Sequence, residues 1–411
     1  MREYTSVDAA LKRVKASLHQ GHGAEAVPAL QAYGRVSAKD VLAPSGVPPF
    51  PTSQMDGFAV IAADLEKATV SRPAVLRVRG ALGPGQAPRL SVSHGETIQV
   101  ATGARVPSRA DAVVPIEAVE VRTGEISVGF APQRGSYVFR AGGDVRRGER
   151  VLYGGRAIRA QEVGLLTALG IAEVSVRTKP TVSVIATGTE LTSAASPKAG
   201  KVPDSHSPIF VRLCQVLGCL GMELGVVGDD PEKLTEVLRK ALATSDLVLT
   251  LGGTSAGSHD LVVGVISGLG PEVMIQGISM DRGRVTAIAS VGGKPILMMP
   301  GPVQGAMNAF ILLGIPLIET LTGRAKSELK IHCTLGEAWE ARKKFSDFRK
   351  IIYVELKNGD ESVAKPLVAE TESIKVLADA DGYVVVPENI ERIEKGEPVV
   401  VRLLPGFSSF W

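Results

Sequence analysis

A chain of 411 residues is too long for one hydrophobic core, and we expect it to divide into two to four domains. The composition, 45% hydrophobic and 22% charged with 45 glycines and 25 prolines, is typical of a soluble globular protein with many turns. The formal net charge of +3 is spread along the chain, which gives no support to a protein that binds nucleic acid or a membrane surface.

The cysteines exclude two kinds of architecture. Cys214, Cys219 and Cys333 are odd in number and form no CxxC pair, so we expect neither a disulfide framework nor a tetrahedral zinc site. Free thiols favour the reducing environment of the cytoplasm.

The first twenty or so residues are predicted to form an amphipathic helix. Val7, Leu11, Val14 and Leu18 recur at helical spacing behind Ser6, and the segment has no apolar region typical of a signal peptide.

Between residues 44 and 142 the sequence consists of short β-rich runs such as "AVLRVRGAL" and "ETIQVATG", separated by Gly and Pro. This pattern predicts an antiparallel β domain. A helical segment, "RAQEVGLLTALG", follows it.

From Pro180 onward, apolar strands alternate with helices, and Pro231 lies in the first turn of one of these helices. The alternation predicts a doubly wound, mostly parallel sheet. The most hydrophobic run, "AMNAFILLGIPLI", is short and interrupted by Gly314 and Pro316, so we expect no membrane-spanning segment. After Gly323 the pattern is β-like again, with a hairpin about Asn358 and Gly359, and it predicts a small barrel or sandwich.

Three loops of the α/β section share one predicted geometry, an apolar strand that runs into a Gly-containing turn and then a helix. In a parallel sheet these turns meet at one edge, where backbone N–H groups and helix N-termini favour an anion. Taken singly, each is more often a plain tight turn. The candidate residues in the three loops are Thr187, Gly188 and Glu190; Gly252, Gly253, Thr254, Ser255, Gly257 and Asp260; and Pro300, Gly301 and Gly305.

Carboxylates in Gly-, Ser- or Pro-rich loops are the second signal, since oxygen ligands suit Mg²⁺ that bridges phosphates. They are Asp56, Asp144, Glu190, Asp204, Asp229, Asp230 and Asp260. Structural alternatives exist: Asp230 before Pro231 is simplest as a helix cap, Asp144 can pair with Arg146 or Arg147, and Asp56 can brace a turn. His206 and His259 lack a partner at metal spacing and are interpreted as polar loop residues.

In this order the motifs resemble those of the MoeA family, the molybdopterin molybdenumtransferases of molybdenum cofactor biosynthesis, which are related to the C-terminal domain of gephyrin. Residues 48–60, "PPFPTSQMDGFAV", are similar to the family's "PPFxxSxMDG(Y/F)AV", and "TGARVPSRADAVV" to its "TGAxxPxGADAVV". "ATGTEL" is similar to "STGDEL", Asp204-Ser205-His206 to "DSN", "LGGTSAGSHD" to "SGGVSVGxxD", and "MPGPVQG" to "LPGNPVS".

The resemblance implies an elongated homodimer of four-domain subunits with a MogA/MoaB-like α/β domain. The domains expected from it are a helix at 1–22 that packs with the α/β domain, a linking domain at 23–45 and 141–177, an inserted β-rich domain at 46–140, the molybdopterin-binding α/β domain at 178–326, and a C-terminal β-barrel at 327–411.

The resemblance also implies an activity: the enzyme takes adenylylated molybdopterin, hydrolyses the adenylate in a step that depends on Mg²⁺ and molybdate, and inserts the metal. The site is expected in a cleft shared between subunits, and a MogA/MoaB-type protein is expected to supply the adenylylated substrate. Catalytic roles fall on Asp56, Glu190 and Asp260, and metal binding on Glu190, Asp229 and Asp260. The expected substrate-binding residues are Ser53, Thr102, Asp144, Thr187, Gly188, Asp204, Ser205, Gly252, Gly253, Thr254, Ser255, Gly257, Arg282, Arg284, Pro300 and Gly301.

The chain departs from the family pattern in several loops. Where the family has "KPGKP", this chain reads "MDRGRV", so that Arg284 keeps one cation but Asp281 stands where a lysine is expected, next to Arg282. "PGPVQ" lacks the family's Asn-Pro, Thr189 replaces an acidic residue, and "AETESIKVLADADG" replaces a Gly-Ser-rich loop.

These departures leave two interpretations open. One is a divergent metal-inserting enzyme, including one that prefers tungstate. The other is a paralogue that binds the ligand as a binding or scaffold protein and no longer turns it over. A nucleotide-processing enzyme that shares only the α/β domain is disfavoured, because the similar motifs continue outside residues 180–325.

Overall fold

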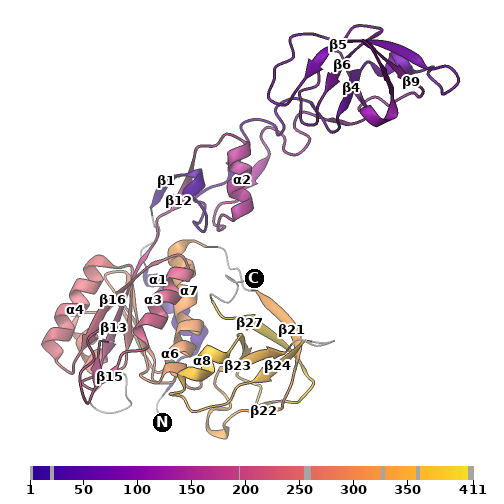
Figure 1. Cartoon of the computed structure of the whole chain (residues 1–411). Helices are drawn as coiled ribbons and strands as arrows, with labels where there is room; N and C mark the ends of the chain where they lie inside the picture. Colours follow the sequence, from indigo (N-terminus) through magenta and orange to yellow (C-terminus); the bar gives the residue numbers. More distant parts are fainter. Residues whose placement is uncertain are drawn as a thin grey trace.

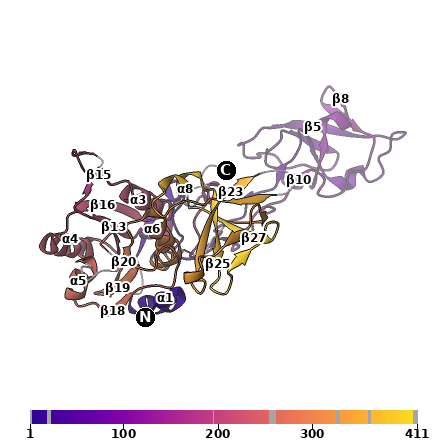
Figure 2. The same ribbon diagram turned by 90° about the horizontal axis from the view of Figure 1, so that it is seen from below.

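The computed structural model describes residues 3–18, 23–193, 195–253, 261–324, 329–357 and 362–405. The molecule is elongated: a β-rich domain lies at one end, a small linking domain follows, and an α/β domain and a barrel lie side by side at the other end (Figure 1). The view from below in Figure 2 shows the same separation of the β-rich domain from the α/β domain.

The α/β domain is built on a six-stranded sheet in the order β16-β13-β17-β20-β19-β18. The first four strands in that order are parallel, and β19 alone runs antiparallel to its neighbours β20 and β18, so the doubly wound, mostly parallel sheet is confirmed. The strands are β13 (Thr181–Thr187), β16 (Leu220–Val227), β17 (Leu247–Leu251), β18 (Val273–Gln276), β19 (Ala287–Val291) and β20 (Lys294–Met299).

Helices cover both faces of this sheet (Figures 1 and 2). Side-chain alternation along β13 explains how: Val182 and Val184 join one core, whereas Ile185 joins the other. The first core takes α1 (Val7–Ser17), α3 (Ser207–Val216), α6 (Val303–Ala309) and α7 (Ile315–Thr322), and the second takes α4 (Pro231–Thr244) and α5 (Leu261–Gly268). The predicted amino-terminal helix therefore packs on the α/β domain, with Ser6 as its N-cap.

The expected interruption at Gly314 and Pro316 is wrong. The helix continues from α6 into α7 through a π-helical turn, η4 (Phe310–Gly314), and a π turn accommodates a proline whose missing N–H would otherwise break the ladder. The combined stretch Val303–Thr322 is long and apolar enough to cross a membrane by composition alone. However, 78% of its most apolar window is buried inside the protein, as in a core helix.

The linking domain is held by two short antiparallel pairs and one helix. The pairs join β1 (Ala24–Pro28) with β12 (Glu173–Arg177), and β2 (Val41–Leu42) with β11 (Arg150–Leu152); the helix is α2 (Ala160–Ala168). The chain runs through this domain twice, once before and once after the β-rich domain, and the two strand pairs join these two segments.

The β-rich domain contains a six-stranded sheet in the order β7-β4-β6-β5-β9-β8. Its strands are β4 (Gly57–Val60), β5 (Ala74–Leu82), β6 (Glu96–Val100), β7 (Ala112–Pro115), β8 (Glu120–Arg122) and β9 (Glu125–Val128). The prediction of a purely antiparallel domain is wrong, because β5 and β6 are parallel. A long crossover, residues 83–95, separates these two strands, and a tight hairpin does not join them. At the root of the domain, β3 (Thr52–Ser53) pairs with β10 (Val138–Phe139).

The carboxy-terminal region forms the predicted barrel, closed in the order β21-β24-β23-β25-β27. Its strands are β21 (Lys330–Leu335), β23 (Lys350–Lys357), β24 (Val363–Pro366), β25 (Gly382–Val386) and β27 (Pro398–Leu403), with α8 (Ile374–Asp379) beside them. The antiparallel β23–β24 pair matches the predicted hairpin, while its turn at Asn358 and Gly359 lies outside the described residues. Tyr353, Val376 and Tyr383 of this region share the core of the α/β domain, so the two bodies pack as one unit.

Candidate functional site

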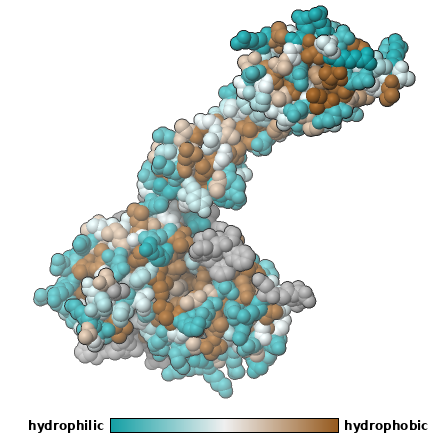
Figure 3. Space-filling view, viewed as in Figure 1, coloured by the Kyte–Doolittle hydropathy of each residue, from teal (hydrophilic) through white to brown (hydrophobic). Residues whose placement is uncertain are grey.

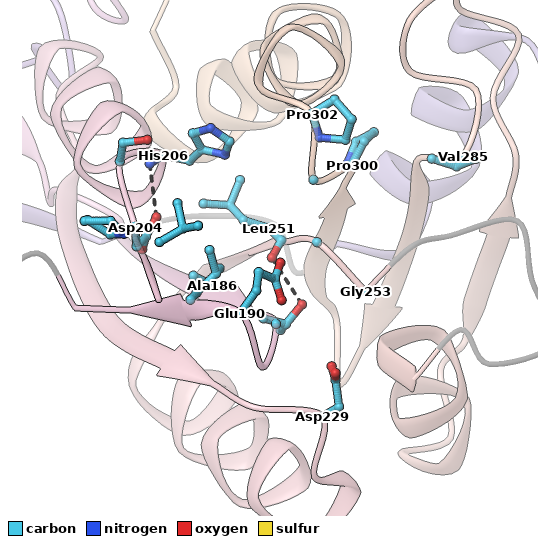
Figure 4. Close-up of a pocket in the computed structure, with 18 residues that line it drawn as sticks. Ala186, Glu190, Asp204, His206, Asp229, Leu251, Gly253, Val285, Pro300 and Pro302 are labelled. Carbon is cyan, nitrogen blue, oxygen red and sulfur yellow. Dashed lines mark hydrogen bonds between the residues drawn. The ribbon is translucent and has the colours of Figure 1, made fainter. Parts of the chain in front are cut away.

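A cleft of about 520 Å³ opens at the edge of the α/β sheet where its parallel strands end. Thr187, Leu251 and Pro300 line it from the ends of β13, β17 and β20. Val285 lines it from just before β19, because an antiparallel strand begins at the edge where its neighbours end. The three loops selected from the sequence therefore meet in one place, as Figure 4 shows.

The middle loop requires glycine at Gly253. Its φ is +66°, and an added Cβ would lie less than 3.0 Å from the Val262 side chain, which real Cβ atoms essentially never do. The turn thus lets the backbone after β17 pass close to the first turn of α5 while Gly252 and Gly253 face the cleft. Thr254, Ser255, Gly257 and Asp260, predicted in the same loop, lie outside the described residues.

The first loop differs from the predicted strand-turn-helix. After Gly188 the chain forms β14 (Leu191–Thr192), which pairs with β15 (Val202–Pro203), and α3 begins only afterwards. The pairing carries the chain across the sheet edge, so that Glu190 and Val202 both line the cleft. The Thr187 hydroxyl is used structurally, since it donates to the Leu251 carbonyl at 3.2 Å and ties β13 to β17.

One end of the cleft is formed by the start of α3 (Figure 4). One oxygen of Asp204 accepts hydrogen bonds from the backbone N–H groups of His206 and Ser207, at 3.0 and 3.1 Å, and so caps the helix. Asp204 is only 5% exposed, and its other oxygen has no hydrogen-bond partner among the described residues. The Ser207 hydroxyl is also buried without such a partner. A buried acceptor and a buried hydroxyl of this kind favour a ligand group that can donate a hydrogen bond.

His206 lines the same end of the cleft, although the sequence suggested only a polar loop residue. Burial lowers its pKa below the usual value, and the nearby Asp204 carboxylate partly opposes that shift. The imidazole is therefore neutral at physiological pH, and it can both donate and accept a hydrogen bond.

Two adjacent aspartates near the other end have different roles. Asp230 caps α4, because one of its oxygens accepts from the N–H groups of Glu232 and Lys233, each at 3.1 Å. Asp229 instead lines the cleft and accepts a hydrogen bond from the Thr189 hydroxyl at 3.2 Å. The structural interpretation of Asp230 is confirmed, and Asp229 remains available to a ligand.

The cleft is acidic. Glu190, Asp204 and Asp229 line it, and Figure 4 shows Glu190 between the other two. No Lys or Arg is found among the lining residues that the structure describes. These residues also contain no group of three His, Cys, Asp or Glu side chains placed to hold a metal ion. Carboxylate oxygens on Glu190 and Asp229 are the donors that Mg²⁺ prefers, so the residues present fit this ion as part of its ligand set.

Arg282 and Arg284, predicted to bind substrate, do not line the cleft. The Arg282 guanidinium donates to the Gln304 side chain and, at 2.8 Å, to the Ala369 carbonyl. The Arg284 guanidinium lies over the Phe345 ring, 4.8 Å from its centre. Both cations are directed toward the barrel, because the loop that carries them packs against it.

A second group of predicted residues lies at the root of the β-rich domain. The Asp56 carboxylate accepts two hydrogen bonds from Thr102, which lower its pKa below the usual value. Both residues are exposed. Ser53, in contrast, is buried, and its hydroxyl donates to the Met55 carbonyl at 2.6 Å within the turn. The structure thus leaves Asp56 and Thr102 accessible and uses the Ser53 side chain to brace the loop.

Asp144 lies in an open hollow of about 620 Å³ lined by residues 142–144 and 146–149. The suggested ion pair of Asp144 with Arg146 or Arg147 is not formed among the described residues. The backbone N–H of Arg146 donates a hydrogen bond to the Glu149 carboxylate at 3.0 Å. This hollow and Asp56 belong to the part of the molecule that Figure 1 shows far from the α/β domain. One chain therefore does not bring Asp56, Thr102 or Asp144 to its own cleft.

Three family models match successive parts of the chain. Residues 5–170 match the "MoeA N-terminal region (domain I and II)", and residues 333–404 match the "MoeA C-terminal region (domain IV)". Residues 183–320, which contain the cleft, match a model described as "Probable molybdopterin binding domain".

Relatives align over almost the whole chain. A molybdopterin biosynthesis protein of Methanocaldococcus jannaschii is 30% identical, with 92% of each chain covered. The molybdopterin molybdenumtransferase 2 of Mycobacterium tuberculosis is 29% identical, over 95% of this chain and 97% of the relative. The molybdopterin molybdenumtransferase of Bacillus subtilis is 28% identical, over 97% and 94%. The crystal structure of the molybdopterin biosynthesis MoeA protein from Pyrococcus horikoshii superimposes with a TM-score of 0.85 at 32% identity, covering 98% of this chain and 99% of that one.

Proposed function

The chain belongs to the MoeA family, and from this premise we propose that it is a molybdopterin molybdenumtransferase that inserts molybdate into adenylylated molybdopterin and releases AMP. The observation that carries the proposal is the cleft of the α/β domain. It lies at the strand ends of the part that matches the molybdopterin binding domain, and its side chains suit a pterin and a phosphate-bound metal.

We propose roles for the residues at each end of this cleft. Asp204, with one buried oxygen that lacks a partner, accepts from N–H groups of the pterin ring, and the neutral His206 adds a second polar contact. The backbone after β17, at Gly252 and Gly253, approaches the phosphate side of the substrate. In this proposed orientation the phosphate lies toward Glu190.

Mg²⁺ is proposed as the cation that lets an acidic cleft take an anionic substrate. Glu190 and Asp229 would hold it, and the ion supplies charge neutralisation for the adenylate phosphate and for molybdate. Without a cation, three lining carboxylates would repel both anions. A carboxylate of this set also orients a water molecule that attacks one phosphorus of the P–O–P bridge. The bridging P–O bond breaks, the attacked phosphate keeps the water oxygen, and AMP and molybdopterin separate with one phosphate each.

A homodimer with a shared site is proposed for the same electrostatic reason. Arg140, Arg146 and Arg147 are exposed beside Asp144, and a second copy that presents this region to the cleft would supply the positive charge that the cleft lacks. Figure 3 shows apolar side chains gathered on the linking domain. Exposed apolar residues there include Leu30, which is 75% exposed, and Tyr33, which is 70% exposed, as expected of a surface that a partner covers.

Two further proposals follow from the family role. A MogA/MoaB-type protein would deliver the adenylylated substrate, and the three free cysteines, Cys214, Cys219 and Cys333, suit a cytoplasmic protein.

The test is AMP release from adenylylated molybdopterin by the purified chain with Mg²⁺ and molybdate. We expect release that requires both, and competition with tungstate followed by metal analysis of the product reports the metal preference. A chain that binds the substrate but releases no AMP, where the Bacillus subtilis relative does release it, would favour the alternative of a binding or scaffold protein. That alternative is kept because Arg282 and Arg284 face away from the cleft.

A further inference from the structure

We propose that Arg282 and Gln304 form a clamp through which the C-terminal domain positions one wall of the cleft. This inference rests on the proposed function for its catalytic consequence, but the clamp itself is defined by contacts within the chain. Its parts are the loop of residues 281–285, the first turn of α6, and the segment of residues 369–373 that precedes α8.

Gln304 is the centre of the clamp. It lies in the first turn of α6, is 1% exposed, and accepts a hydrogen bond on its side-chain oxygen from the Arg282 guanidinium. Its side-chain nitrogen donates to the carbonyls of Glu370 at 2.6 Å and Ser373 at 3.3 Å. Its backbone N–H donates to the Thr371 carbonyl at 3.1 Å. Both polar groups of the Gln304 side chain therefore form hydrogen bonds that hold the three segments together.

Arg282 closes the network from the other side. Besides Gln304, it donates to the Ala369 carbonyl at 2.8 Å, so one guanidinium joins the helix and the barrel segment. The residue has a φ of +53°, which is uncommon for a residue other than glycine and is tolerated here because the surrounding contacts fix it. Gly305 is part of the same fit, since a Cβ there would lie less than 3.0 Å from the Arg282 carbonyl oxygen.

Asp281 anchors the start of the loop to the barrel. Its backbone N–H donates to the Arg349 carbonyl at 2.8 Å, and its carboxylate pairs with Arg342. Its carbonyl accepts from Asn308 of α6 at 3.0 Å, and Asn308 in turn accepts from the buried Tyr353 hydroxyl at 2.7 Å. The acidic residue at 281 is thus explained by the interface with the barrel.

The clamp reaches the cleft through short, stiff connections. Pro300, Gly301 and Pro302 line the cleft and lead directly into α6, whose second residue is Gln304. Val285, at the end of the clamped loop, lines the cleft as well. Prolines at 300 and 302 fix φ and limit how far this wall can move independently of the helix. Holding the first turn of α6 against residues 369–373 therefore sets the position of the wall.

Three separate departures from the family pattern meet in this network. Asp281 and Arg282 replace part of one motif, Gln304 lies in the altered "PGPVQ", and residues 369–373 open the stretch that replaces a Gly-Ser-rich loop. Each looks isolated in the sequence, but together they make one set of hydrogen bonds between the α/β domain and the barrel. The three altered loops are therefore the parts of the chain from which the clamp is built.

The test compares Arg282→Met with Arg392→Met. The first removes the guanidinium of the clamp. The second removes a guanidinium that pairs with Glu340 and Glu394 elsewhere in the C-terminal domain and is the matched control. Hydrogen exchange of the segment 299–309 is measured in both, and AMP release is followed against the concentration of adenylylated molybdopterin at saturating Mg²⁺ and molybdate. Gln304→Glu, which keeps the size of the side chain but loses its donors to residues 370 and 373, serves if Arg282→Met does not fold. Arg282→Lys, with one ammonium, is the conservative variant.

We expect faster exchange in residues 299–309 and a KM about tenfold higher, equivalent to about 1.4 kcal/mol, with kcat little changed, for Arg282→Met and not for Arg392→Met. Arg282→Lys should recover part of both effects. Three results for Arg282→Met would overturn the clamp. They are unchanged exchange in residues 299–309, exchange that rises equally throughout the barrel, and a loss of activity confined to kcat. Because exchange needs no substrate, wild-type protein that releases no AMP would count against the proposed function alone.

Discussion

The Asp56 carboxylate accepts two hydrogen bonds from Thr102, one from its backbone N–H at 2.7 Å and one from its hydroxyl at 3.0 Å. The two residues are 46 positions apart in the chain, and the other carboxylate oxygen has no hydrogen-bond partner among the described residues. We expect Asp56→Ala to lower AMP release about 100-fold or more, the scale of removing a general acid-base group. The free energy of unfolding should change little, because the residue is exposed.

Thr102→Val is the control, since it keeps the backbone donor and loses only the hydroxyl bond. In NMR titration, the Asp56 midpoint should lie below the ordinary value of about 3.9, because the N–H of Thr102 and then its hydroxyl stabilise the charged form. Thr102→Val should raise that midpoint. The sign follows from linkage: the stabilisation is present above the unfolded-state pKa and is lost as pH falls through the lower folded-state pKa. A midpoint in the wild-type protein above the ordinary value would contradict the geometry.

His206 provides a second titration. Burial lowers its pKa, so its NMR midpoint should fall below the ordinary value of about 6.5. Asp204→Asn should lower the midpoint further, because the Asp204 carboxylate is the group that raises it. Since the unfolded chain takes the proton more readily, the protein should lose stability as pH falls below about 6.5. An unchanged midpoint in Asp204→Asn would show that the ring is not beside this carboxylate.

Gly253→Ala tests the strand-end turn. The left-handed φ and the close Val262 side chain should together lower the free energy of unfolding by about 2 kcal/mol or more. Gly264→Ala is the matched control in α5, where an added Cβ meets nothing within 4 Å, and it should be neutral or stabilise by up to about 1 kcal/mol. The free energy of unfolding of each variant is measured by urea denaturation. Equal destabilisation by both substitutions would contradict a specific requirement for glycine at 253.

The neighbours Asp229 and Asp230 should separate binding from stability. Asp230→Ala should lower the free energy of unfolding through loss of the α4 cap, with no change in the Mg²⁺ requirement. Asp229→Ala should instead raise the Mg²⁺ concentration needed for half-maximal AMP release, with little effect on unfolding. If Asp229→Ala lowered the free energy of unfolding and left the Mg²⁺ requirement unchanged, Asp229 would have a structural role and not a role in the cleft.

Local patterns predicted much of this fold. Alternation of strands and helices was enough for the α/β domain because each apolar strand ends in a glycine turn, and Pro231 marked a helix start through its fixed φ. The prediction that Pro316 interrupts the helix was wrong, because a π turn precedes this proline. The hydrophobicity of the sequence does not reveal such a turn. The parallel β5–β6 pair was missed because its crossover has no helix to identify it.

The site could be predicted only where its residues follow strand ends. Glu190 and Pro300 were found in this way, whereas Val285 was missed because its position depends on the antiparallel direction of β19. Arg282 was assigned to substrate because sequence alone does not reveal that Gln304, 22 positions later, would take its guanidinium. A contact of that kind becomes visible only when two domains are packed together.

The most direct test of the shared site mixes two inactive chains. Asp56→Ala and Glu190→Ala subunits are unfolded and refolded together in equal amounts, and AMP release is compared with that of each variant alone. A mixed dimer would contain one cleft with Glu190 that faces Asp56 of the other chain, so we expect the mixture to recover about one quarter of wild-type activity. The controls are that refolded wild-type protein is active and that the two variants have formed mixed dimers. If the mixture is then as inactive as either variant alone, the site is not completed by a second copy.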